Sequence, residues 1–159
     1  MAIERAIAVP THGRYIVEEA IGGGPWRLLI GFHGYAEAAE AQLERLQCIR
    51  VADSWLRVSV QGLHRFYRGR TTDVVASWMT KQDRELAIDD NISYVAATIE
   101  DVARARPVNR LVFAGFSQGV AMAFRAAARS LRPVAGVIAL GGAIYPTSAE
   151  AATTAGLAR

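Results

Sequence analysis

The sequence contains a single cysteine, Cys48, and a single lysine, Lys81. One cysteine cannot form an intramolecular disulfide, which fits a reducing compartment, and we therefore expect a cytoplasmic protein. No apolar run approaches the ~20 residues that a membrane-spanning helix needs, and the first residues lack the charged-then-apolar layout of a signal peptide. These absences predict a soluble protein without stable insertion into a membrane.

Clustered metal ligands and dense positive charge are also missing. The three histidines are dispersed along the chain, so we predict no metal site and no other cofactor. The net charge of +3 comes from scattered arginines, and without a basic stripe or a nucleic-acid-binding module we expect no nucleic-acid partner. The one local concentration, Arg65, Arg68 and Arg70, is either a solvated loop or a group at a pocket mouth that attracts an anionic substrate.

Apolar segments with the periods of strands and helices alternate along the chain. We predict strands at 26–32, 55–60, 111–116 and 134–140 and helices at 36–49, 83–104 and 118–130. An antiparallel hairpin of 2–9 and 14–20 is expected before them, and 61–80 is expected to be a long irregular segment. Strands that alternate with helices imply a parallel sheet covered on both faces, so the predicted fold class is α/β.

Residues 115–119 read Gly-Phe-Ser-Gln-Gly, directly between a predicted strand and a predicted helix. This pattern is typical of a nucleophile elbow, in which Gly115 and Gly119 leave room for a strained serine. Ser117 could instead be an ordinary helix N-cap, but the two glycines favour a catalytic nucleophile. We expect the backbone N–H of Gln118, at the start of the helix, to be one donor of an oxyanion hole.

A second motif, His33-Gly34-Tyr35, directly follows the predicted strand 26–32. The carboxyl ends of parallel strands meet at one edge of a sheet, so this motif and the elbow are expected to lie together. The backbone N–H of Tyr35 is our candidate for the second oxyanion donor. His33 and Gly34 are expected to support the loop, and a role of His33 as general base is a weaker alternative.

Three stretches carry a family resemblance: Leu-Ile-Gly-Phe-His-Gly-Tyr (29–35), Ala-Gly-Phe-Ser-Gln-Gly-Val-Ala-Met-Ala (114–123) and Ile-Ala-Leu-Gly-Gly-Ala-Ile-Tyr-Pro (138–146). Together they resemble the phospholipase/carboxylesterase family of α/β-hydrolases, which includes acyl-protein thioesterase-like enzymes. The resemblance covers about residues 26 to 146. It implies a mostly parallel sheet flanked by helices and a small-molecule ester or thioester substrate. It also implies Ser117 as nucleophile, with the Tyr35 and Gln118 amides in the oxyanion hole.

The sequence departs from the family in its acid and base. Such hydrolases place Asp or Glu, and then His, after the serine. Here no Asp and no His follows Ser117, and the single carboxylate side chain after it is Glu150. We therefore expect residues 1–159 to be the N-terminal two-thirds of a single α/β-hydrolase domain. Its open strand edge would then favour a homo-oligomer or association with the missing C-terminal segment. The alternatives are an upstream histidine as base, an acyltransferase, or a non-catalytic binding or interaction protein on a truncated hydrolase scaffold.

Several other residues have less specific interpretations. Cys48 is predicted to be a small core residue on its helix. Trp78, Phe66 and Tyr67 either line an acyl pocket or pack in the core. His64 is expected on the surface or in a pocket wall rather than as a base.

Overall fold

In the computed structural model, which describes residues 1–50 and 55–143, five strands form one sheet in the order β1-β3-β2-β6-β7. They are β1 (Arg14–Glu18), β2 (Trp26–Phe32), β3 (Trp55–Gln61), β6 (Val108–Phe116) and β7 (Val134–Leu140). Only β1 runs antiparallel to its neighbour in this sheet; the other pairs are parallel. The predicted α/β class with a mostly parallel sheet is therefore confirmed.

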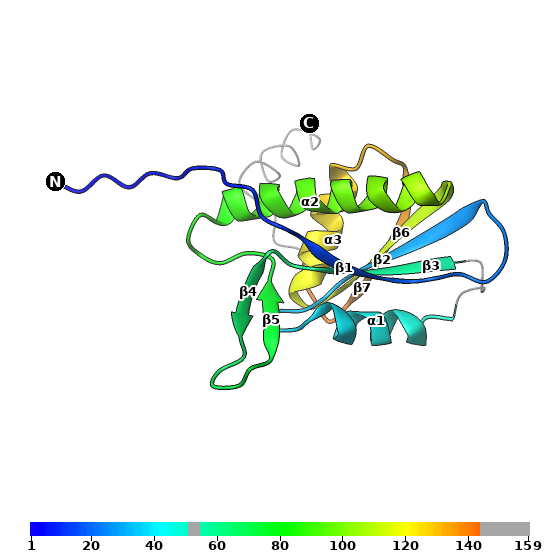
Figure 1. Ribbon diagram of the computed structural model, residues 1–159, viewed down its shortest axis with the longest axis horizontal. Helices are drawn as coiled ribbons and strands as arrows, with labels where there is room; N and C mark the ends of the chain where they lie inside the picture. The colour runs from blue at the N-terminus through cyan, green and yellow to red at the C-terminus, as the bar shows by residue number, and fades with distance from the viewer. Residues whose placement is uncertain (51–54, 144–159) are drawn as a thin grey trace, which may run out of the picture.

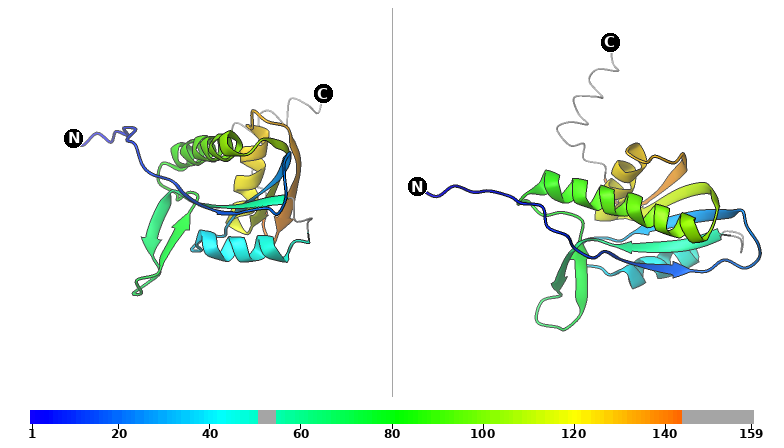
Figure 2. Two further views of the ribbon diagram at one scale, coloured as in Figure 1. Left: turned by 45° about the vertical axis from the view of Figure 1, so that its right-hand side comes forward. Right: turned by 45° about the horizontal axis from the view of Figure 1, so that its top comes forward.

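Helices cover both faces of this sheet. They are α1 (Ala39–Cys48), α2 (Arg84–Ala105) and α3 (Gln118–Ala128). Figure 1 shows α2 above the sheet and α1 below it, and the turned views in Figure 2 agree. Helix α3 packs on the side of α2, where Met122 and Ala123 join the same core cluster as Ile92. The central strand β2 serves both faces, because Leu28 and Ile30 join the larger core cluster while Leu29 packs against Leu46 of α1. Burial on both faces explains why β2 reads as a continuous apolar run.

The long helix α2 forms because its apolar residues recur at helical spacing. Its buried stripe consists of Ile88, Ile92, Val95, Ile99 and Val102. The helix ends at Ala105, and Pro107 lies two residues beyond, where a further turn would lack a backbone N–H. Among the described residues, no helix combines the length and the apolar character needed to cross a membrane.

The expected N-terminal hairpin is wrong. Residues 1–13 form no strand, and β1 pairs with β3, where Val17 lies opposite Val58. The alternating residues of 2–9 are compatible with a strand but remain exposed, and this segment runs away from the sheet in Figure 2. An isolated two-stranded hairpin is marginal in water, whereas pairing with β3 extends a sheet that already has a core.

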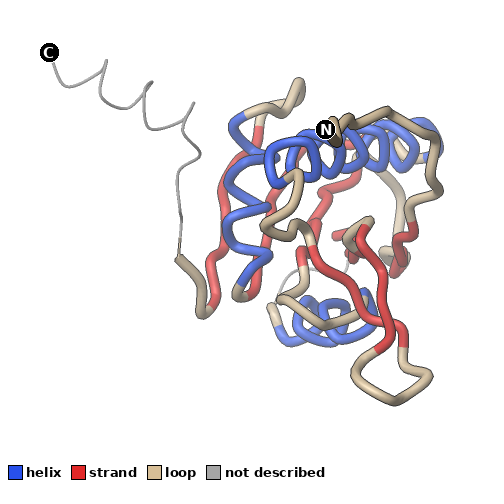
Figure 3. Tube along the Cα trace, turned by 90° about the vertical axis from the view of Figure 1, so that its left-hand side faces the viewer, coloured by secondary structure: helices blue, strands red, loops and turns tan. Residues whose placement is uncertain are grey.

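The segment predicted to be irregular contains a second, small sheet. Strands β4 (His64–Tyr67) and β5 (Val74–Ser77) form an antiparallel hairpin, with Tyr67 opposite Val74. Gly69, at φ +56°, lies in the connection, which projects from the body in Figure 3. The prediction failed because both strands are four residues long and every residue of β4 is exposed, so no alternating pattern marks it.

Candidate active site

Ser117 lies between the end of β6 and the start of α3 in an unusual backbone conformation, with φ +52° and ψ −116°. A non-glycine residue rarely adopts such a positive φ, and the surrounding structure has to hold it there. The Ser117 N–H donates to the carbonyl oxygen of Leu140 in β7 (2.9 Å), and the Ser117 carbonyl oxygen accepts from the N–H of Val120 (3.1 Å). The bend is thus anchored from a neighbouring strand and from the first turn of the helix.

The glycines on either side of the bend allow strand and helix to approach closely. A Cβ on Gly115 would lie 2.5 Å from the carbonyl oxygen of Gly119. A Cβ on Gly119 would lie 2.6 Å from the carbonyl oxygen of His33 and closer still to that of Phe32. Side chains at either position would push α3 away from the carboxyl ends of β6 and β2. The glycine pattern of the sequence therefore reflects packing between main chains.

The two motifs found in the sequence meet at this edge of the sheet. Gly34 lies in the loop after β2, and a Cβ placed on it would be 3.3 Å from the Cβ of Ser117. In the sheet, Phe32 lies beside Gly115 in the parallel pairing of β2 and β6. The register of these two strands thus brings the loop alongside the elbow.

Hydrogen bonds in the loop engage the N–H groups on either side of Tyr35. The N–H of Gly34 donates to the carboxylate of Glu37 (2.8 Å), and that of Ala36 donates to the carbonyl oxygen of Ala76 (3.0 Å). Within the described ranges, no acceptor is recorded for the N–H of Tyr35 between them. The side chain of Tyr35 is exposed and packs near the ring of Phe66, with ring centroids 5.7 Å apart.

His33 is completely buried, and both of its ring nitrogens are engaged. The Gly62 N–H donates to Nε2 (2.9 Å), so the ring proton resides on Nδ1, which donates to the carbonyl oxygen of Gly34 (2.7 Å). The ring stacks on Trp78, whose indole N–H donates to the His33 carbonyl oxygen (2.8 Å). Burial lowers the pKa of His33 and keeps it neutral. This environment supports the loop and leaves no free nitrogen for a general base.

The buried neutral His33 predicts a pH-dependent stability. Because its pKa is lowered in the folded state, the unfolded chain binds the proton first as the pH falls below about 6.5, and stability declines. In urea titrations over a pH series, His33→Gln is expected to be less stable near neutral pH but to show a weaker decline in acid. His64→Gln, at an exposed site, is the control, and an equally steep decline in both variants would contradict this account.

The side chain of Gln118 ties the elbow to the segment after β5. Its Oε1 accepts from the N–H of Trp78 (3.1 Å), and its Nε2 donates to Oγ of Ser77 (3.1 Å) and to the carbonyl oxygen of Met79 (3.4 Å). The backbone N–H of the same residue is at the first position of α3, where helix N–H groups have no intrahelical acceptor. Gln118 thus has a structural side chain and a main-chain donor beside Ser117.

A hollow of about 720 Å³ opens beside Ser117. Its described lining residues are Met79, Arg84, Ser117, Gln118, Ala121, Arg125, Gly141, Gly142 and Ala143. No His, Asp or Glu is among them, and the described part of the chain gathers no group of three His, Cys, Asp or Glu residues that could hold a metal ion. The hollow is large enough for a small ester, with the serine in its wall.

Comparison with known proteins now identifies the family. Residues 27–158 match the Phospholipase/Carboxylesterase family. The chain belongs to this family. Three solved structures are similar, as follows. Esterase PE8 has 22% identity, a TM-score of 0.64, and coverage of 84% of this chain and 66% of that one. A Bacillus cereus carboxylesterase has 12% identity, a TM-score of 0.63, and coverage of 83% of this chain and 61% of that one. Zea mays acyl-protein thioesterase 2 has 17% identity, a TM-score of 0.59, and coverage of 84% of this chain and 63% of that one. No curated protein matches.

The family resemblance predicted from the motifs is therefore confirmed, and the solved relatives share the fold. The chain spans less than two thirds of the length of these phospholipase/carboxylesterase-type structures, at 66%, 61% and 63%. Residues 144–159, which contain Glu150, lie outside the described residues. The part of the family fold described here thus holds the elbow and the loop after β2.

The aromatic residues considered for the pocket separate in the structure. Trp78 is completely buried, in contact with Phe32 and His33. Phe66 and Tyr67 are exposed on the hairpin, and none of the three lines the hollow beside Ser117. The core interpretation is confirmed for Trp78, and both interpretations are wrong for the other two. Their aromatic character gave no indication that the hairpin would project from the core.

The other surface predictions had mixed outcomes. The arginine cluster lies on the hairpin and its loop, is exposed, and is not among the residues that line the hollow; Arg68 donates to the carbonyl oxygen of Ala36 (3.0 Å). The solvated-loop interpretation is therefore confirmed. The arginines that do line the hollow are Arg84 and Arg125. Cys48, predicted to be a core residue, is exposed, because α1 ends there and its buried stripe stops at Leu46.

Sequence reasoning missed the ion pair behind the loop. Two guanidinium nitrogens of Arg45 donate to the two carboxylate oxygens of Glu37, at 2.8 Å from Nη1 to Oε2 and 2.5 Å from Nη2 to Oε1. They are eight residues apart, and Glu37 precedes α1, so helical spacing did not connect them. The only sequence signal was an acidic residue three positions after Gly34, a spacing at which a side chain can return to a backbone N–H.

Proposed function

We propose that this chain supplies the nucleophile and the oxyanion hole of a serine hydrolase that cleaves carboxylic ester or thioester bonds. The observation that carries the proposal is the contact of the two motifs, with the Cβ position of Gly34 3.3 Å from the Cβ of Ser117. The positive φ of Ser117 and the hollow beside it support the same function. Membership of a phospholipase/carboxylesterase family supports an ester substrate.

The reaction begins with attack of Ser117 Oγ on the carbonyl carbon, as its proton passes to a base. The carbonyl oxygen becomes an oxyanion, which accepts hydrogen bonds from the N–H groups of Tyr35 and Gln118. Collapse breaks the ester or thioester bond, and the leaving alcohol or thiol takes the proton. Water then attacks the acyl-enzyme by the reverse proton path, releasing a carboxylic acid and restoring Ser117. No cofactor takes part in these reaction steps.

The base is proposed to come from outside the described residues. His33 has both nitrogens engaged, and His12 and His64 are exposed rather than in the wall of the hollow. A histidine held by a carboxylate, contributed by polypeptide beyond this sequence, would complete the triad. In that arrangement residues 1–159 are the larger part of one hydrolase domain.

A fluorophosphonate probe tests this function. We expect it to modify the protein of natural length on one peptide, the one that contains Ser117. Ser117→Ala is expected to abolish labelling and the hydrolysis of p-nitrophenyl esters. Ser93→Ala, which changes an exposed serine of α2, is the matched control and should keep both. Absence of labelling in the folded wild-type protein would refute the proposal and favour a non-catalytic binding protein, and equal labelling of Ser117→Ala would refute Ser117 as the nucleophile.

A further inference from the structure

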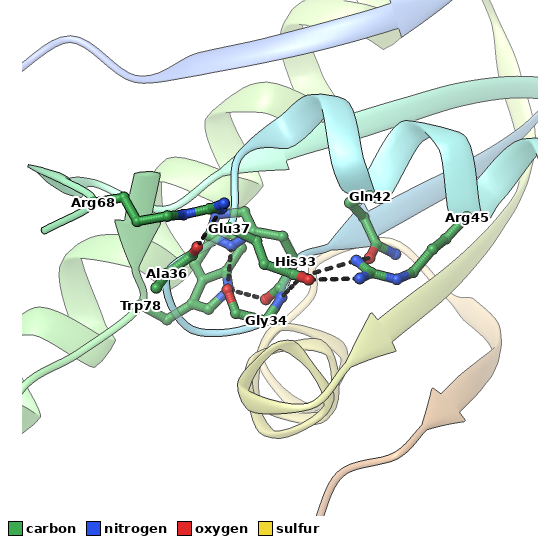
Figure 4. A network of polar contacts seen from close by, with 8 residues as sticks. All are labelled: His33, Gly34, Ala36, Glu37, Gln42, Arg45, Arg68 and Trp78. Atoms are coloured by element: carbon green, nitrogen blue, oxygen red, sulfur yellow. Dashed lines mark hydrogen bonds and ion pairs between the residues drawn. The ribbon is translucent and has the colours of Figure 1, made fainter. Parts of the chain in front are cut away.

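The carboxylate of Glu37 lies directly behind the loop that follows β2 (Figure 4). One oxygen, Oε2, accepts the N–H of Gly34 (2.8 Å) and a guanidinium N–H of Arg45 (2.8 Å), and Oε1 accepts a second N–H of Arg45 (2.5 Å). This two-pronged geometry is the strong form of an arginine–carboxylate pair. Both side chains are mostly buried, with 21% of Glu37 and 28% of Arg45 exposed.

The network continues from Arg45 to the residue before the nucleophile. The guanidinium carbon of Arg45 lies 3.8 Å from the centre of the Phe116 ring, and Phe116 directly precedes Ser117. A cation over an aromatic face at this distance is attractive, more so when it is partly shielded from water. The carboxylate of Glu37 therefore connects the loop after β2 to the elbow through a single arginine.

The main chain of the loop is fixed on its other side by β5. The Ala36 N–H donates to the carbonyl oxygen of Ala76 (3.0 Å), and the Ala76 N–H donates to that of Glu37 (2.8 Å). Ala36 itself has a positive φ of 57°, so the chain turns sharply here. Tyr35 is thus held between two anchored neighbours, and its own N–H is the one that these anchors leave available.

We propose that Glu37 is a positioning residue that orients the Tyr35 N–H toward Ser117, with Arg45 neutralising its charge. The proposal rests on the proposed function, since Tyr35 is the oxyanion donor there. Glu37 occupies the N–H of Gly34 and so fixes the His33–Gly34 peptide plane, and the next plane, which carries the Tyr35 N–H, is held by the hydrogen bond from His33 Nδ1 to the Gly34 carbonyl oxygen. An uncompensated carboxylate so close to the site would repel the developing oxyanion, and the paired guanidinium removes that repulsion.

The pKa of Glu37 is consistent with a permanent ion pair. Burial opposes ionisation of the carboxyl group, but hydrogen bonds from Arg45 and from the Gly34 N–H outweigh it, and the pKa lies below its ordinary value. The carboxylate therefore stays charged at neutral pH. The anchor is complete under the conditions in which an esterase is measured.

Three variants of the natural-length protein test the proposal. Glu37→Ala removes the anchor, and Glu37→Gln keeps a carbonyl acceptor for the Gly34 N–H. Glu40→Ala is the matched control, because Glu40 also pairs with an arginine, Arg14 of β1 (2.5 Å), but in an exposed position. We expect Glu37→Ala to lower kcat and the limiting rate of fluorophosphonate labelling by about 10–100-fold with KM within about twofold. Glu37→Gln should recover most of this loss, and Glu40→Ala should cause none.

Two further measurements separate positioning from general support. Arg45→Gln leaves Glu37 uncompensated, so its kcat is expected to rise when Glu37→Gln is added, a coupling that a double-mutant cycle measures. Amide hydrogen exchange is expected to become faster at Gly34 and Ala36 in Glu37→Ala and to stay unchanged in Glu40→Ala. If Glu37→Ala unfolds, the kcat of the Arg45→Gln single variant is compared with that of the Glu37→Gln/Arg45→Gln double variant, and this comparison decides the question.

The outcomes distinguish this proposal from the hydrolase function. If Glu37→Ala and Glu40→Ala have the same kcat and labelling rate, the positioning role of Glu37 is refuted while the hydrolase function stands. If the wild-type protein is not labelled at all, the hydrolase function fails. Hydrogen exchange at Gly34 and Ala36 then decides alone: acceleration at both in Glu37→Ala supports the anchor, and unchanged exchange overturns it.

Discussion

Gly119→Ala is expected to destabilise the fold by about 4 kcal/mol and to abolish labelling of Ser117. The new methyl group would lie 2.6 Å from the carbonyl oxygen of His33 and closer to that of Phe32. Both obstacles are main-chain atoms at the end of the central strand, so no side-chain rotation relieves the overlap. Helix α3 has to move away from β2, which carries the bend at Ser117 away from the loop.

Urea denaturation followed by circular dichroism measures this loss of stability. Gly23→Ala is the matched control, because a Cβ at Gly23 meets no atom within 4 Å and no positive φ is required there. That variant is expected to be neutral or more stable by up to about 1 kcal/mol, since alanine restricts the unfolded chain. A Gly119→Ala protein with wild-type stability and labelling would show that the close approach of α3 to β2 is not needed.

Ser117→Gly is expected to abolish hydrolysis and labelling while it raises the free energy of unfolding by about 1–2 kcal/mol. The wild-type residue has φ +52° and ψ −116°, a conformation that glycine adopts with little strain. The glycine variant loses the proposed nucleophile and releases the strain at the same time. Stability and chemistry should therefore change in opposite directions at this one position.

Ser117→Ala provides the comparison that isolates backbone strain. It removes the same hydroxyl group but keeps a Cβ, so it should be as inactive as Ser117→Gly without the gain in stability. Thermal or urea unfolding of the three proteins measures the difference. If glycine and alanine at position 117 have equal stability, the positive φ of the wild-type residue carries no energetic cost and the elbow is not strained.

The parts of the fold that were predictable have strong local signals. The apolar run of β2, the helical stripe of α2 and the strand–glycine–serine–helix succession at Ser117 each occupy a continuous segment. Their boundaries moved by only a few residues, as for β6, which begins at Val108 rather than at 111. Burial on one face or both faces imposes a periodicity, and periodicity is visible without knowledge of the partner.

The failures share a different physical origin. The pairing of β1 with β3 and the hairpin of β4 and β5 depend on which edge or turn the chain finds, and strands of four or five residues do not display that choice in their residues. The same holds for Cys48, whose exposure follows from the point at which α1 ends. In each case the sequence was compatible with several partners, and packing selected one.

The sequence by itself determined the class of the fold and the family, and it singled out Ser117 as the proposed nucleophile, because glycines and apolar periodicity act over a few neighbouring residues. Only the tertiary structure decided which main-chain N–H groups stay available. Glu37 and Ala76 occupy the N–H groups of Gly34 and Ala36 and leave that of Tyr35. Ala76 reaches the loop from a distant strand, and such long-range hydrogen bonds produce no repeating pattern along a chain.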